Sequence, residues 1–300
     1  MAVDRSVEIV VRAPAKLNLY LEVLGRRNDG YHDVETLMVP VSLCDVLTFR
    51  DSPEEQVLLS LDWGASKAAD DSVGGLPAGA ENLVVRAVEL LRRRFAVGRG
   101  ARMRLLKRVP WGSGLGGGSS DAAAALRAAN SAWGLGLCEA ELSPLAAELG
   151  SDVPFFLRPG AAVCRGRGEV IEPLPPIGRL DGVLVRPPHG LSTAAVYAAA
   201  GGAAGPAGGV GPLVDALRRG DRRRAGRLLF NRLLPAAARL SPWIERTFRA
   251  LEAEDCWGRT MTGSGTCCFG LCAHWRHARR VAKRLQRGGV GRAMAVHTGP

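Results

Sequence analysis

The sequence contains little lysine, few aromatic residues and no long apolar run. Only four of its 40 basic residues are lysines (Lys16, Lys67, Lys107 and Lys283), and Phe, Trp and Tyr make up 5% of the chain. No uninterrupted apolar run approaches the roughly 18 residues that a membrane-spanning helix needs, so we expect no membrane partner. The opening residues MAVDRSVEIVVRAPAK also lack an apolar signal core, and we therefore expect a cytoplasmic protein.

The seven cysteines do not suggest a disulfide framework. Their number is odd and their spacing is irregular in a chain of 300 residues, which is typical of a reducing compartment. A zinc site is one alternative, with Cys267, Cys268, Cys272, His274 and His277 as its possible ligands. However, adjacent cysteines on a strand point to opposite faces, and the remaining spacing fits no standard pair of zinc ligands. We therefore assign no zinc ligand from the sequence.

Arginine supplies most of the positive charge, which raises the question of nucleic-acid binding. The net charge is +11 and the pI is near 10.0, values that fit a polyanion-binding protein. The arginine runs 92–94 and 222–224 nevertheless fall in helical patterns, and no aromatic residues alternate with them to stack on bases. We expect solvated helix faces and no nucleic-acid partner. An arginine-rich nucleic-acid-binding protein remains the alternative that is not an enzyme.

Apolar periodicity indicates strands and helices that do not alternate regularly. Strands are predicted over residues 17–24, 46–49, 56–61, 102–109, 181–185 and 291–297. Helices are predicted over 83–95, with Asn82 as the N-cap, over 119–133, 141–149 and 275–287, and across 213–254. Because the composition changes near residue 175, we expect an α+β protein with one domain over residues 1–175 and a second over residues 176–300.

A glycine-rich segment directly precedes a strong helix former at residues 110–130, PWGSGLGGGSSDAAAALRAAN. Glycine allows successive backbone N–H groups to point into one concavity, and the positive end of the helix dipole attracts an anion. The segment therefore predicts a phosphate site. Ser119 and Ser120 are expected in the N-cap region of the helix, and Asp121 in its first turn.

Several phosphate motifs compete for this segment. No Gly-Lys-Ser/Thr is present, which excludes a Walker loop. Gly112, Gly114 and Gly117 match the dinucleotide pattern, but the match is weak because five glycines occupy seven positions. A glycine-rich linker without a ligand is a further alternative.

The spacing Pro-x-x-x-Gly-Leu-Gly-x-x-Ser-Ser, which starts at Pro110, resembles the nucleotide loop of the GHMP small-molecule kinases. Three more segments resemble the same family, in the same order and over essentially the whole chain: APAKLNLYLEVLGRRNDGYHDVETLMVPVSLCD at 13–45, ELGSDVPFFL at 148–157 and MTGSGTCCFG at 261–270. The resemblance implies the two-domain GHMP kinase fold. Its N-terminal domain is like domain 2 of ribosomal protein S5, its C-terminal domain is ferredoxin-like, and the active site lies in the cleft between them.

The resemblance also implies a reaction. Segments 13–45 and 148–157 are similar to the branch of the family that uses ATP to phosphorylate the 2-hydroxyl of a cytidine diphosphate-linked methylerythritol, in the non-mevalonate (MEP) pathway of isoprenoid biosynthesis. We accordingly expect an ATP-dependent small-molecule kinase that uses Mg²⁺, and a monomer or weak homodimer. A GHMP kinase of homoserine or mevalonate type remains the alternative. The turn NDGYHD favours the cytidine substrate, because a substrate without a base has no use for stacking residues.

Lys16 and Asp152 correspond to the catalytic pair of the family. Lys16 interrupts an apolar strand, and Asp152 lies beside Phe155 and Phe156, where partial burial would require a cationic partner such as Lys16. The expected mechanism has Asp152 as the base, with Lys16 orienting the hydroxyl and offsetting charge. The alternatives are a surface lysine and a turn aspartate. Before Asp152, the preceding helix is expected to end at a left-handed Gly150, and Pro154 is expected to hold Val153 extended.

The remaining candidate residues fall into three sets. The loop 112–120 is expected to hold the ATP phosphates, within a nucleotide-binding set of Pro110, Trp111, Gly112, Ser113, Gly114, Leu115, Gly116, Gly117, Gly118, Ser119 and Ser120. Substrate binding is expected from Asn18, which shares a strand face with Lys16, and from Tyr31, His32 and Tyr197, which suit a cytosine ring. The turn Gly263, Ser264 and Gly265 resembles the third family motif, which packs against the phosphate site. Ser119 or Ser120 are the candidates for contact with Mg²⁺.

Overall fold

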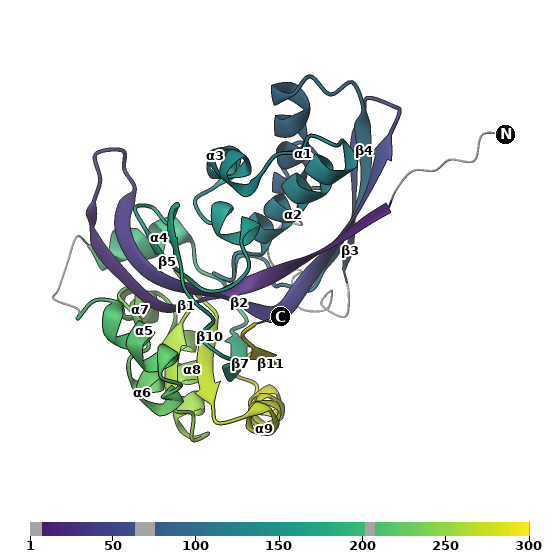
Figure 1. The fold of residues 1–300 in the computed structure, drawn as a ribbon. Helices are drawn as coiled ribbons and strands as arrows, with labels where there is room; N and C mark the ends of the chain where they lie inside the picture. The colour runs from purple at the N-terminus through teal and green to yellow at the C-terminus, as the bar shows by residue number, and fades with distance from the viewer. Residues whose placement is uncertain (1–7, 64–75, 202–207, 300) are drawn as a thin grey trace. The chain divides into compact units, whose positions relative to one another are not determined.

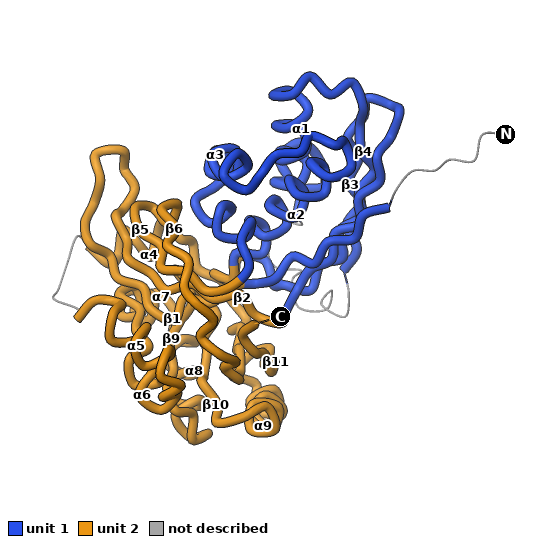
Figure 2. Tube along the Cα trace, in the orientation of Figure 1, with its two compact units in different colours: residues 1–15, 43–111, 116–159 blue, residues 16–42, 112–115, 160–300 orange. Residues whose placement is uncertain are grey.

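The computed structural model of the protein describes residues 8–63, 76–201 and 208–299. The chain forms two compact units, coloured separately in Figure 2. Unit 1 comprises Met1–Ala15, Leu43–Trp111 and Gly116–Pro159, and unit 2 comprises Lys16–Ser42, Gly112–Leu115 and Gly160–Pro300. The predicted domain boundary at residue 175 stays a prediction.

Two long strands contribute residues to both units. These are β1 (Glu8–Arg26) and β2 (His32–Ser52), so the predicted strands at 17–24 and 46–49 are parts of longer ones. In unit 1, β2 pairs antiparallel with β4 (Gly100–Lys107), and β3 (Val57–Trp63) pairs parallel with β4. Leu47 and Phe49 of β2 are fully buried, which places this face of the sheet in the core.

Three helices and a 3₁₀ turn complete unit 1: α1 (Leu83–Arg94), α2 (Gly117–Ala132), α3 (Glu139–Leu149) and η2 (Pro154–Leu157). The predicted N-cap of α1 is confirmed, because the Asn82 side chain accepts a hydrogen bond from Val84 N at 2.9 Å. Helix α2 packs against α1, and its run of alanines is buried. Figure 1 shows α1 between α3 and β4.

The chain between α3 and η2 differs from its prediction. Gly150 is extended, with φ 168° and ψ 154°, and Val153 is helical, with φ −63° and ψ −43°. The expectation of an extended residue before Pro154 was therefore wrong. Here the 3₁₀ turn begins at the proline, Phe156 N donates to Val153 O at 3.1 Å, and the buried rings of Phe155 and Phe156 pack edge to face at 5.1 Å.

Unit 2 contains a four-stranded antiparallel sheet in the order β11-β7-β10-β9. Its strands are β7 (Asp181–Arg186), β9 (Gly258–Met261), β10 (Cys268–Cys272) and β11 (Arg292–His297). Helices α8 (Pro242–Glu252) and α9 (Trp275–Arg287) pack on this sheet. Their apolar faces meet Val183, Val185 and Cys268 in one core.

The rest of unit 2 frames the first half of β2 and the second half of β1. Strand β5 (Ala162–Arg165) pairs antiparallel with β2, and β6 (Val170–Pro173) pairs antiparallel with β5. The short β8 (Phe230–Asn231) pairs parallel with β1. The remaining helices are α4 (Thr193–Ala200), α5 (Gly211–Arg218), α6 (Arg222–Arg227) and α7 (Leu234–Leu240). Among the described helices, none is both long and apolar enough to cross a membrane.

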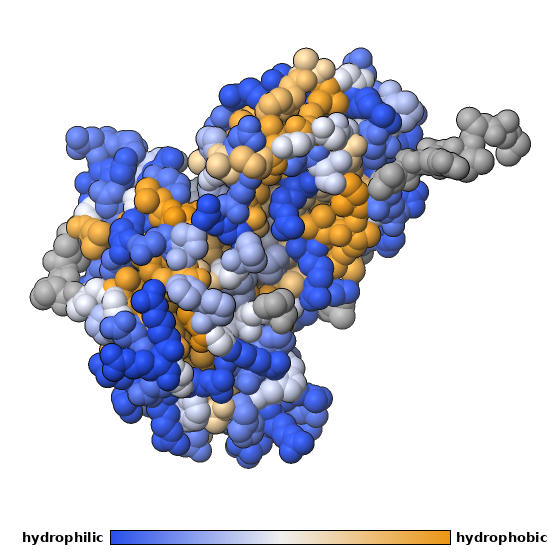
Figure 3. Space-filling view, in the orientation of Figure 1, coloured by the Kyte–Doolittle hydropathy of each residue, from blue (hydrophilic) through white to orange (hydrophobic). Residues whose placement is uncertain are grey.

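Hydrophilic residues cover part of the helical surface of unit 2. Figure 3 shows mostly hydrophilic residues over α5, α6 and α8 in this view. The arginine run 222–224 lies exposed in α6, and Arg223 stacks on the Trp257 ring at 5.3 Å. In unit 1 the run 92–94 forms the last turn of α1, where positive charge is favourable to the helix dipole.

Candidate functional site

The glycine loop joins β4 to α2 and contains three left-handed glycines. Gly112, Gly114 and Gly116 have φ of 63°, 75° and 68°. Gly116 is itself the N-cap, so α2 begins at Gly117, two residues earlier than predicted. Ser119 and Ser120 therefore lie inside the first turn and do not cap the helix, and Asp121 lies beyond that turn.

The loop meets the turn that resembles the third family motif. A Cβ on Gly114 would overlap the carbonyl oxygen of Thr262, and a Cβ on Gly263 would lie 3.1 Å from Gly114 O. Gly263 and Gly265 also have positive φ, 58° and 100°. Glycine is required on both sides because the two backbones touch. The third member of the turn, Ser264, is buried, and its hydroxyl lies 2.8 Å from that of Thr193.

Lys16 is buried and lies beside this turn. Its side chain is on the same strand face as Asn18, as the strand periodicity predicts, and Lys16 Nζ donates to Asn18 Oδ1 at 2.5 Å. A Cβ on Gly263 would be 3.5 Å from Lys16 Nζ. The backbone of Lys16 donates to Leu115 O at 2.9 Å, which ties β1 to the glycine loop.

Asn18 connects several segments of unit 2. Its Oδ1 also accepts from Gly263 N at 2.8 Å and Thr262 Oγ1 at 3.2 Å, while its Nδ2 donates to Thr36 Oγ1 at 2.8 Å. Protein groups thus already engage both ends of the amide, and the expected contact of Asn18 with substrate stays a prediction. Thr262 was not singled out from the sequence; the one hydrogen of its buried hydroxyl can go either to Asn18 Oδ1 or to Gly114 O, which lies 3.3 Å away.

A second buried lysine lies at the start of the glycine loop, in unit 1. Lys107 Nζ donates to Asp45 Oδ2 at 2.5 Å and to Asp121 Oδ2 at 2.6 Å, and all three side chains are at most 2% exposed. We call these three residues the buried triad. The sequence analysis did not single out Lys107 or Asp45, although lysine is rare in this chain.

The triad contains two carboxylates for one ammonium group. Burial favours the neutral form of Lys107, but the charges of Asp121 and Asp45 outweigh this and raise the pKa of the lysine. Burial raises the pKa of Asp121 to about 7; Lys107 opposes this shift and Asp45 adds to it. Asp121 Oδ1 and the neighbouring Ser120 Oγ are buried without a hydrogen-bond partner in the described part of the chain.

Asp152 lies in the turn between α3 and η2 of unit 1, and its side chain is half-buried. It precedes the buried pair Phe155 and Phe156. Lys16 belongs to unit 2, and the pairing of Asp152 with Lys16 stays a prediction.

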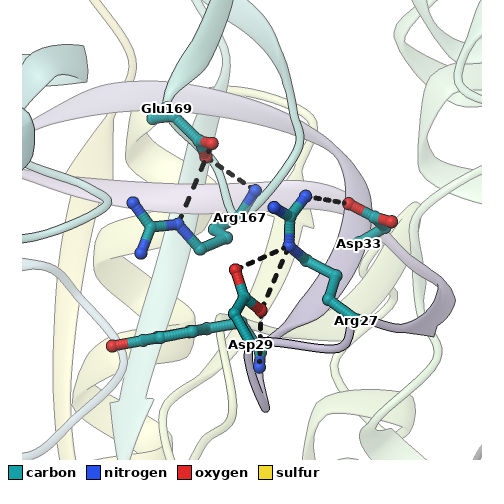
Figure 4. A network of polar contacts seen from close by, with 6 residues as sticks. Arg27, Asp29, Asp33, Arg167 and Glu169 are labelled. Carbon is teal, nitrogen blue, oxygen red and sulfur yellow. Dashed lines mark hydrogen bonds and ion pairs between the residues drawn. The ribbon is translucent and has the colours of Figure 1, made fainter.

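Tyr31 lies in the turn between β1 and β2, and it is 54% exposed to solvent. Figure 4 shows how the turn is braced: Arg27 contacts Asp29 at 3.1 Å and Asp33 at 2.9 Å. The guanidinium of Arg167, from the segment between β5 and β6, lies 4.8 Å from the centre of the Tyr31 ring.

Two other predicted substrate residues lie together. The rings of His32 and Tyr197 stack at 4.7 Å with an interplanar angle of 30°. Tyr197 also packs against the core of unit 2, so a structural role and a binding role are both compatible with its position. The structure thus brings aromatic rings from β2 and α4 to one place.

The cysteines near the third motif are buried. Cys267 and Cys268 are fully buried, and burial raises the pKa of Cys267 to about 12. In the described residues, no three His, Cys, Asp or Glu side chains gather in a way that could hold a metal ion. Cys267 N donates to Ser113 O at 3.3 Å, a further tie between the third motif and the glycine loop.

Comparison with known proteins adds to this geometry. Residues 82–160 match the family model of the GHMP kinases N terminal domain, and residues 213–291 match that of the GHMP kinases C terminal domain. The chain is 44% identical over 280 residues to the 4-diphosphocytidyl-2-C-methyl-D-erythritol kinase of Pelotomaculum thermopropionicum, covering 93% of this chain and 94% of the relative. It is 40% identical over 282 residues to the enzyme of the same name from Moorella thermoacetica, covering 93% and 95% of the two chains.

Solved structures show the same fold. The chain is similar to a crystal structure of 4-(cytidine 5'-diphospho)-2C-methyl-D-erythritol kinase, with a TM-score of 0.79 and 37% identity over 97% of this chain and 100% of the other. A homoserine kinase from Cytophaga hutchinsonii, at 22% identity, gives a TM-score of 0.75 over 100% of this chain and 96% of the other, and shares the fold alone.

Proposed function

Because this chain belongs to the GHMP kinase family, we propose that it transfers the γ-phosphoryl group of ATP to the 2-hydroxyl of 4-diphosphocytidyl-2-C-methyl-D-erythritol. The chain is an ATP-dependent small-molecule kinase, and its relatives at 36–44% identity carry the name of this kinase. The reaction belongs to the non-mevalonate (MEP) route of isoprenoid biosynthesis. The observation that carries the proposal is the buried Lys16 ammonium, held by Asn18 beside the touching turns of Gly114 and Gly263.

Phosphoryl transfer needs alignment, charge stabilisation and a group that receives the hydroxyl proton. We assign the proton to Asp152, while Lys16 orients the hydroxyl and offsets negative charge. The N–H groups of the glycine loop 112–120 hold the phosphates of ATP at the positive end of the α2 dipole. Three left-handed glycines support this role because they turn successive N–H groups toward one side.

Mg²⁺ accompanies ATP in this proposal and neutralises charge on the phosphates. This ion is commonly held by substrate phosphates, water and one or two protein oxygens. Ser119, half-buried in the first turn of α2, is a better candidate for contact than Ser120, whose hydroxyl is enclosed by protein.

The cytidine moiety is assigned to Tyr31, His32 and Tyr197. Tyr31 offers an exposed ring face, and the imidazole of His32 provides a hydrogen-bonding edge beside the Tyr197 ring. The exposed Tyr31 on a braced turn favours a substrate with a base over homoserine or mevalonate.

Turnover of ATP with the cytidyl substrate, compared with homoserine and mevalonate, tests the substrate assignment. We expect turnover only with the cytidyl substrate. Preference for either small acid would replace the assignment by another GHMP kinase activity.

The Asp152→Asn variant tests the catalytic base. The amide cannot accept the hydroxyl proton, so we expect kcat to fall by roughly 10²- to 10⁴-fold with little change in the KM for ATP. Glu148→Gln is the matched control, because it removes a nearby exposed carboxylate that pairs with Arg94. Near-normal turnover of Asp152→Asn would show that another group receives the proton.

A further inference from the structure

The turn between β5 and β6 presents one arginine between two glycines. Its residues 166–169 follow β5 directly, and Arg167 lies between Gly166, with φ 69°, and Gly168, with φ 116°. Gly168 N donates to Arg165 O at 3.0 Å, which closes the turn. A residue with a Cβ would be strained at either glycine, so the path of the backbone through Arg167 depends on both of them.

Glu169 holds Arg167 at two points. Its carboxylate accepts a hydrogen bond from Arg167 N at 2.6 Å and lies 3.8 Å from Arg167 Nε (Figure 4). A Cβ on Gly166 would be 3.0 Å from both carboxylate oxygens, so the glycine leaves the room that this contact needs. The side chains of Arg167 and Glu169 are 31% and 27% exposed. An arginine held in this way loses less rotamer freedom when it makes a further contact.

This turn lies beside the turn that carries Tyr31. Val34 N donates to Gly166 O at 2.8 Å, which joins the start of β2 to the turn between β5 and β6. The guanidinium of Arg167 then lies over the Tyr31 ring, 4.8 Å from its centre. All of these residues belong to unit 2, so the contact is made within one compact unit.

The backbone of Tyr31 is fixed, whereas its ring reaches solvent. Arg27 N donates to Tyr31 O at 2.8 Å, and Tyr31 N donates to Asp29 Oδ1 at 3.1 Å. The residue is nevertheless 54% exposed. An exposed ring on a fixed backbone can still change rotamer, and a guanidinium over one face restrains this motion. Because Arg167 covers one face only, the opposite face stays open to a planar ligand.

We propose that Arg167 is a positioning residue for the cytidyl substrate: it covers one face of the Tyr31 ring and holds the ring so that the cytosine stacks on the opposite face. This inference rests on the proposed function, because it requires the cytidine moiety to bind at Tyr31. Ordering the ring before the substrate arrives lowers the entropy cost of binding. Arg167 acts through Tyr31 and takes no part in phosphoryl transfer.

Steady-state kinetics of Arg167→Leu test this role. A stack on the base stabilises the bound substrate and the transition state equally, so its loss raises KM without lowering kcat. We expect the KM for the cytidyl substrate to rise about three- to fivefold, as for the loss of an exposed cation–π contact. The kcat and the KM for ATP should stay within about twofold of wild type, whereas a general loss of structure would change all three.

A double-mutant cycle tests whether Arg167 acts through the ring. In a Tyr31→Leu background there is no ring to hold, so adding Arg167→Leu should change the KM for the cytidyl substrate by less than about 1.5-fold. A rise of about three- to fivefold in both backgrounds would overturn the inference, because Arg167 would then act on the substrate independently of Tyr31.

Two further variants complete the test. Arg179→Leu is the matched control, because it removes another arginine of unit 2 that lies over an aromatic ring, 5.5 Å from the centre of Trp275. Its KM for the cytidyl substrate should equal that of wild type within about 1.5-fold. Arg167→Lys keeps a cation for the Tyr31 ring, so its KM should be at least about twofold below that of Arg167→Leu. Equal KM values for these two variants would overturn the inference. Should Arg167→Leu fail to fold, Arg167→Gln takes its place in each comparison.

An unchanged KM for the cytidyl substrate in folded Arg167→Leu would overturn the inference and leave the proposed function intact. A wild-type protein that does not turn over the cytidyl substrate would overturn both.

Discussion

Two of the four lysines, Lys16 and Lys107, lie buried in a chain that carries its exposed positive charge mainly as arginine. Their side chains are 4% and 2% exposed. An ammonium group is compact and donates hydrogen bonds in three directions, so oxygen atoms can surround it. The guanidinium of arginine is planar and donates in one plane, so it needs acceptors that lie in that plane. Replacement by arginine would therefore not be conservative at either position. The rarity of lysine was a signal by which Lys107 could have been found from the sequence.

The buried thiols give a prediction at the residue scale. Cys267 stays protonated at pH 8, because burial raises its pKa to about 12, and it is also sealed from reagents. Cys138 is exposed. Under native conditions at pH 8, we expect iodoacetamide to modify Cys138 at least ten times faster than Cys267 or Cys268, as followed by mass spectrometry. Comparable rates would contradict the buried position of the third motif, and denatured protein provides the control in which all cysteines react.

At the scale of elements, the contact between the glycine loop and the third motif gives a matched pair of variants. Gly112→Ala meets open space and bears only the cost of a left-handed residue, roughly 1–2 kcal/mol. Gly114→Ala bears the same cost and also overlaps Thr262, which adds about 1–3 kcal/mol. The free energy of unfolding in denaturant should therefore fall further for Gly114→Ala. Equal losses would show that the two turns do not touch.

The sequence allowed most helices and strands to be predicted, because their periodicity is local. Asn82 was identified as a cap, and α9 was predicted with its observed bounds. The start of α2 was missed because serines usually cap helices, whereas here a left-handed Gly116 does so. The conformation of Val153 was missed because its packing outweighs the usual effect of the following proline.

The sequence predicts only those residues of the candidate site that lie within family motifs. Lys16, Asp152 and the glycine loop follow from the family resemblance. The buried triad and the role of Asn18 depend on contacts between residues far apart in the sequence, such as Lys107 with Asp45, which periodicity does not contain. The α+β class and the GHMP kinase fold are confirmed. Their prediction depended on the order of the motifs along the chain rather than on any single motif.

At the scale of the whole molecule, part of the positive charge is paired within the protein. Exposed arginines contact acidic residues in both units, among them Arg102 with Glu54 and Arg249 with Glu245. Such exposed pairs contribute little to stability, but they occupy groups that would otherwise bind phosphates. The net charge of +11 already counts these acidic partners, so the pairs spread the charge over the surface but leave the excess of positive charge in place.

We expect duplex DNA in excess to leave kinase turnover unchanged within about twofold at 150 mM salt, since the attraction of DNA to scattered surface arginines is screened at this ionic strength. A coupled ATP assay with and without DNA checks this expectation. At about 20 mM salt, weak DNA binding is expected and provides the positive control. Strong inhibition at 150 mM would favour a nucleic-acid partner.

The hydrogen bonds of Asn18 span most of the chain, since its partners Thr262 and Gly263 follow 244 and 245 residues later. At about 5–20 residues per second, a ribosome needs roughly 10 to 50 s to make that interval. For all of this time Lys16 already exists, but the turn that completes its surroundings does not. Lys16, the lysine proposed for catalysis, is thus synthesised well before the turn that encloses its ammonium group.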